Sequence, residues 1–283
     1  MVEVSHHNIQ AWTALGCVLE LYRYAPGRAD GTLRHSHEEY QFCLSLNFPG
    51  EYFYRRAYHA VPVGALSVIH PGELHSAQDR EDRPYPVLYR MLSAPVLLLQ
   101  QLGAQIAGRD VGAPFFKVPV VLDAELRHLF VAFHRATAPA APLLVQEAAL
   151  IELMCLWIER YADRGQSVRF PPDAPQAVQR ARAYLEDNIS RNITMAELAQ
   201  IAGLNPYHLH RLFERSFGCP PHRYHLQIRI ERARRMLARG EIASEVALAT
   251  GFADQSHFSR HFKRWWAVTP GRYAPPIKNV QDP

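Results

Sequence analysis

The C-terminal third of the chain repeats one helical pattern after 49 residues. In the first copy, Thr194 begins a short apolar helix, Gly203 provides the sharp turn, and Asn205 begins a second helix. Small polar residues cap helix N-termini, and glycine accepts the positive φ of such turns. The apolar stripe of the second helix recurs in the second copy, where Leu209, Phe213 and Phe217 are matched by Phe258, Phe262 and Trp266. This repeat predicts an all-α region with two helix-turn-helix units.

Polar and basic side chains are expected to face away from both stripes. The second helix of a helix-turn-helix enters the major groove of DNA, where its exposed N-terminal residues meet base edges. A single unit also occurs as a purely structural element, but two units with basic outer faces favour double-stranded DNA as a partner. The candidate DNA-binding residues are Tyr207, His208, His210, Arg211 and Arg215 in the first unit, and Gln255, Ser256, His257, Arg260, Lys263 and Arg264 in the second.

The distribution of charge agrees with a nucleic-acid partner for this region. Residues 1–174 contain 15 Lys and Arg against 18 Asp and Glu, whereas residues 175–276 contain 15 against 8. A spacer helix is expected over residues 221–239, and at about 1.5 Å per residue it is about 28 Å long. That length is close to the ~34 Å between successive major-groove segments on one side of B-DNA. One chain can therefore reach two adjacent segments, although some spacer arginines are expected to form ion pairs within the helix.

Residues 177–276 resemble the DNA-binding domain of the AraC/XylS family of bacterial transcription regulators. The matching stretches are Ile201-Ala-Gly-Leu-Asn-Pro-Tyr-His-Leu-His-Arg-Leu-Phe, Gly251-Phe-Ala-Asp-Gln-Ser-His-Phe-Ser-Arg-His-Phe-Lys and Thr269-Pro-Gly-Arg-Tyr. The resemblance implies a sequence-specific regulator that forms a homodimer and has RNA polymerase as a further partner. One departure is Ala267, at a position where the family usually carries glycine.

The N-terminal part has a different periodicity. Tyr40, Phe42, Leu44 and Leu46 alternate with polar residues, and turn signals separate several short apolar runs between residues 15 and 92. Such a pattern predicts strands of a sandwich or barrel. Helical spacing follows, with candidate helices at residues 123–136 and 143–161. The second is apolar on more than one face, which fits either ordinary core packing or a dimer interface.

Two N-terminal stretches resemble the signature sequences of cupins, Leu33-Arg-His-Ser-His-Glu-Glu-Tyr-Gln and Val68-Ile-His-Pro-Gly-Glu-Leu-His. In AraC-like sensor domains, this resemblance implies a barrel that binds a small-molecule effector. Strand alternation places alternate polar residues on one face. The candidate effector-binding residues are His35, His37, Glu39, Gln41 and His75.

The same histidines allow two other interpretations. His35, His37 and His75 are residue types that can hold a divalent metal. Enzymatic cupins usually carry a glutamate where this chain has the neutral Gln41, which weakens such a site, so the expectation is no cofactor. Purely structural histidines are the third possibility.

The expected fold class is α+β with two domains. A cupin-like β-barrel with trailing helices spans residues 1–162 and serves effector binding and dimerisation. A linker with three prolines and a glycine spans residues 163–176, and the all-α double helix-turn-helix domain spans residues 177–276.

Composition and motifs narrow the function further. With 48% hydrophobic and 20% charged residues, the chain is not expected to be disordered. Four distant cysteines indicate no disulfide or zinc framework. No membrane span, signal peptide, nucleophile elbow or phosphate loop is recognisable. The prediction is a cytoplasmic, non-enzymatic regulator that does not bind membranes. The alternatives are a metal-dependent cupin enzyme with a helical accessory domain and a DNA-binding protein without an effector.

Overall fold

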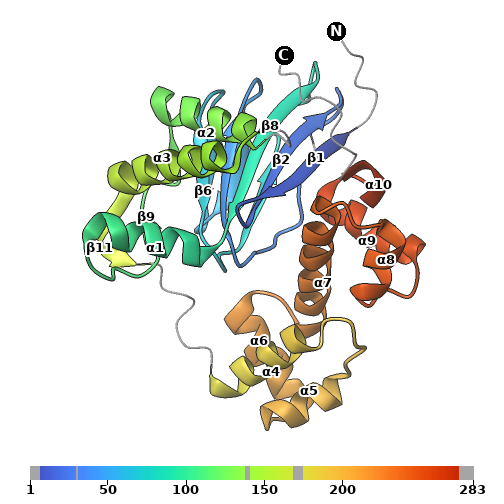
Figure 1. Cartoon of the computed structure of the whole chain (residues 1–283). Helices are drawn as coiled ribbons and strands as arrows, with labels where there is room; N and C mark the ends of the chain where they lie inside the picture. Colours follow the sequence, from blue (N-terminus) through green and yellow to red (C-terminus); the bar gives the residue numbers. More distant parts are fainter. Residues whose placement is uncertain (1–6, 30, 138–140, 168–174, 274–283) are drawn as a thin grey trace. The chain divides into compact units, whose positions relative to one another are not determined.

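The computed structural model describes residues 7–29, 31–137, 141–167 and 175–273. The chain divides into two compact units, one formed by residues 1–168 with 272–283 and the other by residues 169–271. The first unit is rich in strands and the second is helical, as the change of periodicity along the sequence predicts (Figure 1).

The N-terminal unit is built from antiparallel sheets. The largest has the strand order β1-β2-β8-β3-β6-β10 and consists of β1 (Asn8–Ala14), β2 (Cys17–Tyr24), β8 (Val87–Ala94), β3 (Tyr40–Ser45), β6 (Leu66–Ile69) and β10 (Val120–Val121). A three-stranded sheet has the order β5-β4-β7 and consists of β5 (Ala57–Val61), β4 (Gly50–Tyr54) and β7 (His75–Gln78). The strand-rich fold is confirmed, but the sheets do not close into a barrel. In the described residues, strand pairing joins neither the two edges of the large sheet nor the two sheets to each other.

Three helices cover one face of the large sheet: α1 (Val96–Ala107), α2 (Ala124–Ala136) and α3 (Leu143–Tyr161) (Figure 1). The alternation predicted for β3 is confirmed, because Tyr40, Phe42 and Leu44 are fully buried on this face. Phe42 packs against Trp157 of α3, with 4.4 Å between the ring centroids. Aromatic pairs at such distances add to the free energy gained from burying their large apolar surfaces.

The beginning of the predicted linker has a partner strand. Strand β11 (Ala162–Ser167) pairs with β9 (Pro114–Phe116), with Ala162 opposite Phe116 and Ser167 opposite Pro114. Residues 163–167 are therefore extended, as expected, but they belong to a paired strand instead of a free linker, because a short polar strand carries no hydrophobic alternation that marks it in the sequence. Residues 168–174, which hold two of the three prolines, lie outside the described residues.

The C-terminal unit consists of short helices around the long helix α7 (Pro221–Ala238). Before α7 come α4 (Gln176–Asp187), α5 (Met195–Ala202) and α6 (Pro206–Phe217), and after it come α8 (Ala243–Ala249) and α9 (Gln255–Trp266). The short helix α10 (Pro270–Tyr273) includes the residues at which the division between the units falls. The predicted stripes are buried, with Leu209, Phe213, Phe258 and Phe262 fully enclosed. Both helix-turn-helix units are thus confirmed as α5–α6 and α8–α9.

Side-chain caps define where the second helix of each unit begins. Asn205 Oδ1 accepts a hydrogen bond from the His208 backbone N–H at 2.8 Å, and Asp254 Oδ1 accepts one from His257 N–H at 2.7 Å. Each cap satisfies a backbone donor that has no partner within the helix. At the other end of α9, Ala267 adopts a left-handed φ of 59° where glycine is usual, so the departure seen in the sequence changes a helix terminus only.

Candidate nucleic-acid interface and effector site

The two recognition helices, α6 and α9, present most of the predicted DNA-binding side chains to solvent. Nine of the eleven predicted residues are exposed, whereas His210 and His257 are half-buried. The exposed residues begin in the first turn after each cap, where a recognition helix meets base edges. The buried stripes fix the rotation of each helix and thereby determine which residues face outward.

Arg211 is partly oriented by its own helix. Its Nη1 donates a hydrogen bond to the Tyr207 hydroxyl at 3.2 Å, and its guanidinium carbon lies 5.9 Å from the centre of the Tyr207 ring. The two residues are one turn apart, so they stand on the same side of α6. Tyr207 limits the rotamers of Arg211, which lowers the entropy cost of forming a further hydrogen bond.

His257 differs from its predicted outward orientation. Its Nε2 lies 3.0 Å from Nε2 of His261, and its ring packs at 5.7 Å from that of Phe252. Burial lowers the pKa of His261, and the neighbouring His257, Arg264 and Arg260 add to this effect. At most one of two imidazole nitrogens in direct contact carries a proton, so one ring donates the hydrogen bond and the other accepts it.

Two arginines of α7 are held in contacts within the domain, so fewer of its arginines can contact DNA than their number in the sequence indicates. Arg234 is 1% exposed, pairs with Glu231 at 2.6 Å, and lies 5.2 Å from the Trp266 ring. Arg229 donates to three backbone carbonyls. These two side chains hold the domain together, and the sequence alone does not distinguish them from surface arginines.

The cupin-like signature folds differently from the predicted continuous strand. Glu38 and Glu39 form a bend, and β3 begins only at Tyr40. His35 instead forms a short antiparallel bridge with His75, through backbone hydrogen bonds of 2.9 Å in both directions. Strand alternation is therefore the wrong reason for placing His35, His37 and Glu39 together. The fold brings the histidines together by pairing the segment before β3 with β7.

The three histidines form a buried cluster. The ring centroid of His75 lies 4.3 Å from that of His35 and 4.8 Å from that of His37. In each ring Nδ1 lies 2.7–3.1 Å from a backbone carbonyl oxygen, that of Leu33, Glu39 or Glu73. Burial, with the charges of the other two histidines, holds the pKa of His75 well below its ordinary value. His75 is therefore neutral, with its proton on Nδ1 and a lone pair on Nε2.

The two remaining predicted effector residues have different surroundings. Gln41 contacts the cluster, because its Oε1 lies 3.1 Å from His37 Nε2. The Glu39 side chain is buried, and burial of Cys17, together with the nearby Glu39 charge, raises the pKa of the Cys17 thiol to about 12. Among the residues that the structure describes, no group of three or more histidine, cysteine or acidic side chains has the arrangement of a metal site.

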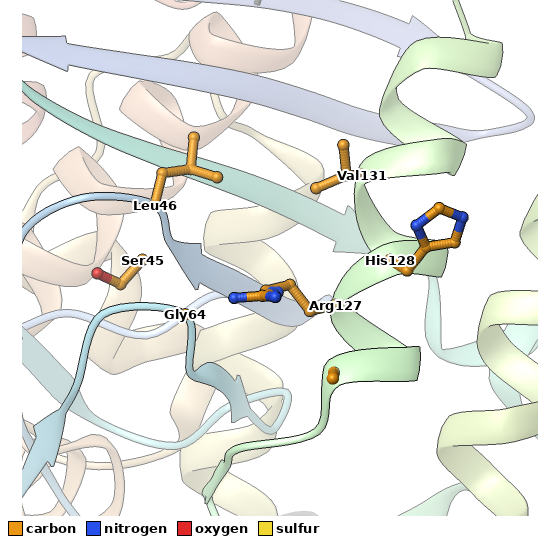
Figure 2. A pocket seen from close by; sticks show the side chains of 7 residues that line it. Ser45, Leu46, Gly64, Arg127, His128 and Val131 are labelled. Atoms are coloured by element: carbon orange, nitrogen blue, oxygen red, sulfur yellow. The ribbon is translucent and has the colours of Figure 1, made fainter. Parts of the chain in front are cut away.

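A separate pocket of about 350 Å³ lies between the end of β3, the turn at Gly64 and the first turns of α2 (Figure 2). Its lining combines basic, polar and apolar residues, namely Ser45, Leu46, Gly64, Ala124, Arg127, His128 and Val131. The Arg127 guanidinium crosses Gly64, where a Cβ atom would come within 2.9 Å of Nη1. No sequence pattern indicates this pocket beyond the turn signal at Val63-Gly64, because its residues come from three distant segments.

Two protein-family models match these two units. Residues 19–154 match the AraC-like ligand binding domain, and residues 198–275 match the helix-turn-helix domain. The chain belongs to the AraC family of transcription regulators. The predicted family is thereby confirmed, with an N-terminal domain of the ligand-binding type and a C-terminal domain of the DNA-binding type.

Similar proteins agree with membership of the AraC family. The uncharacterized HTH-type transcriptional regulator YbfI of Bacillus subtilis is 28% identical over 194 residues, which are 69% of each chain. GlxA of Rhizobium meliloti, an HTH-type transcriptional regulator, is 39% identical over 88 residues, 31% of this chain and 27% of that protein. A variant of ToxT from Vibrio cholerae, solved in its apo form, has the same fold, with a TM-score of 0.66 at 14% identity over 93% of this chain and 98% of that one.

The buried histidines of the N-terminal unit predict a pH-dependent stability. His70 accepts a hydrogen bond at Nε2 from Phe116 N–H at 2.9 Å, and burial with the nearby Arg55 lowers its pKa to about 3. Below the ordinary pKa of 6.5, the unfolded chain binds protons that His70 and His75 in the folded state do not. The free energy of unfolding therefore falls as the pH falls from about 6.5 towards 3, by about 1.4 kcal/mol per pH unit for each such group.

Urea unfolding between pH 7 and pH 5 measures this dependence. Replacing His75 by Gln is expected to make the pH dependence of the N-terminal unit shallower, whereas His128→Gln, at an exposed histidine, is expected to leave it unchanged. Equal slopes in the wild type and the His75 variant would contradict the assignment of His75 as neutral.

Proposed function

We propose that α6 and α9 each contact the bases of one major-groove segment of a promoter. Arg211 and Arg260, at equivalent positions of the two units, are assigned to base edges, where arginine forms paired hydrogen bonds with guanine. Arg215, Lys263 and Arg264 lie about one turn further along and are assigned to phosphates, which position the protein without reading sequence. The observation that carries this proposal is the exposure of the same helix face in both units, immediately after matching caps.

Single arginine substitutions separate base contacts from phosphate contacts. Replacing Arg211 or Arg260 by Ala is expected to weaken binding to a selected cognate site by about 1–3 kcal/mol and to relax base preference at one position. Arg215→Ala serves as the matched control and is expected to weaken binding to the cognate duplex and to random duplexes by the same factor. Titrations on both duplexes at one salt concentration measure the difference. Equal losses on both for the Arg211 variant would assign that residue to phosphate instead.

We also propose that the histidine cluster binds a polar organic effector by hydrogen bonding, without a metal. The neutral His75 offers an acceptor at Nε2, so hydroxyl, amide or amine groups of a ligand are suitable partners. His35, His37 and Gln41 complete the proposed site, because each of them contacts another member of the cluster. One ToxT structure of Vibrio cholerae contains an unsaturated fatty acid. The buried polar cluster of this chain fits a more polar molecule.

A substitution in the cluster tests the effector site. Thermal unfolding of the wild type in the presence of a panel of polar metabolites is expected to identify stabilising compounds, since a ligand that binds only the folded state raises its stability. The variant His75→Gln is expected to lose that response while keeping operator affinity in the absence of the compound. His128→Gln is the control that retains the response. Loss of operator binding in a folded His75 variant would contradict the assignment of effector binding to the N-terminal domain and DNA binding to the C-terminal domain.

The regulator is further proposed to act in the cytoplasm without catalysing a reaction of its own, and to contact RNA polymerase at its promoters. The curated relatives are named as transcriptional regulators, and no described helix is long and apolar enough to span a bilayer. A relative from Bacillus subtilis is named a bifunctional transcriptional activator/DNA repair enzyme, but its similarity to this chain covers only 91 residues, at 31% identity. A metal-dependent cupin enzyme is the second candidate, and retained metal with turnover would favour it over the regulator.

The outer face of α3 is the proposed homodimer interface. Leu150, Leu153 and Trp157 face the core, whereas Leu144 and Ile151 on the same helix are 75% and 50% exposed. Exposed apolar residues two turns apart form a stripe that a second copy of the same helix can cover.

Replacing Ile151 by Glu is expected to convert a dimer into a monomer, because it places a charge in the centre of the apolar interface. Leu97→Glu, at an exposed leucine of α1, is the matched control and is expected to leave the dimer intact. Native mass spectrometry gives the subunit number directly. A wild-type protein that stays monomeric at micromolar concentration, or a dimeric Ile151 variant, would contradict this interface.

A further inference from the structure

The internal repeat extends beyond the two helix-turn-helix units. Arg180 of α4 and Arg229 of α7 are also 49 residues apart, so each repeat consists of a leading helix and a helix-turn-helix. Arg180 holds the end of α5, where its Nη2 donates to the Ala202 carbonyl at 2.6 Å and its Nε to that of Ile201 at 3.3 Å. Arg229 makes the equivalent contact in the second repeat, because its Nη1 donates to the Gly251 carbonyl at 3.1 Å.

Arg229 additionally reaches into the first repeat. Its Nε donates to the Ile189 carbonyl and its Nη2 to the Arg191 carbonyl, both at 2.7 Å. These carbonyls belong to the loop between α4 and α5. One planar guanidinium thus joins this loop to the turn of the second helix-turn-helix, whereas the described contacts of Arg180 stay within its own repeat. The rigid fork of arginine suits such a bridge, since several donors are fixed in one plane.

The backbone of the loop between α4 and α5 contacts the backbone of the turn at Gly251 where Arg229 bridges the two segments. Ser190 lies between the two carbonyls that Arg229 holds, and a Cβ atom on Gly251 would come within 2.4 Å of the Ser190 carbonyl oxygen. Gly251 also has a φ of 79°, which favours glycine. The contact therefore permits neither a side chain at residue 251 nor much displacement of the loop.

We propose that Arg229 is a positioning residue that fixes the separation and rotation of α6 relative to α9, and thereby the spacing between the two base-pair segments that the protein accepts. The inference rests on the proposed binding of DNA by both helices. One inserted base pair moves a segment by about 3.4 Å and rotates it by about 34° around the duplex. A rigid joint cannot follow such a change, whereas a loosened joint can.

Binding-site selection from a random duplex pool, followed by spacing variants of the selected site, tests this inference. The full-length wild type is expected to lose about tenfold or more in affinity when one base pair is inserted between the two segments. Arg229→Gln is expected to bind the selected site more weakly and to lose less than about threefold on the insertion. Arg180→Gln removes the same side chain and charge from the first repeat and is expected to keep the wild-type spacing preference.

The outcomes separate this inference from the proposed function. A wild type that enriches no sequence contradicts DNA reading itself, and with it this inference. A folded Arg229→Gln variant with the wild-type spacing preference overturns the role of Arg229 alone, as does an equal loss of preference in Arg180→Gln. If Arg229→Gln does not fold, the same spacing measurements on Arg229→Lys test the inference. Its single ammonium cannot bridge both segments, so the preference is again expected to weaken, and an unchanged preference overturns the inference.

Discussion

The direct contact between the backbones of Ser190 and Gly251 is the constraint on which the DNA-binding unit depends. Two helix-turn-helix units connected only by a helix can bend relative to each other, but here the second turn rests on the loop of the first repeat. Unpaired backbone carbonyls at such a contact are costly, and Arg229 satisfies three of them. A polar side chain in the middle of α7 thereby makes one rigid unit from two repeats.

The N-terminal unit shows a related principle at its histidines. Burial favours the neutral imidazole, and each ring of the cluster is held by a backbone carbonyl at Nδ1. The rings are therefore oriented before any ligand arrives, which reduces the entropy lost on binding. Gln41 of β3 contacts this cluster, whereas its neighbour Phe42 packs in the core beneath the helices, so β3 contributes to both the core and the polar site.

The sequence predicted those features that depend on local pattern. Caps at Asn205 and Asp254 and the stripe through Phe213 and Phe262 were recognisable because helix periodicity and capping involve residues a few positions apart. The prediction of the linker was less accurate, since β11 forms only by pairing with β9, which is distant in the sequence. The outward orientation expected for His257 differs for a similar reason, because contacts with neighbouring rings determine where its own ring lies.

The N-terminal sheets illustrate the same limit. Alternation identified β3, but it extended the strand through Glu39, where the chain bends. The closure of a barrel depends on which edges pair, and the repeat of hydrophobic residues does not encode this. The role of Arg229 was hidden among the other arginines of α7, because its partners are carbonyls, and a carbonyl has the same chemistry at every residue.

Hydroxyl-radical footprinting of the full-length protein on a selected promoter fragment tests the central claim most directly. Two recognition helices held in one rigid unit predict two protected segments per protein chain, on one side of the duplex and about one helical turn apart. Protection of a single segment, or of two segments on opposite sides of the duplex, would contradict the account.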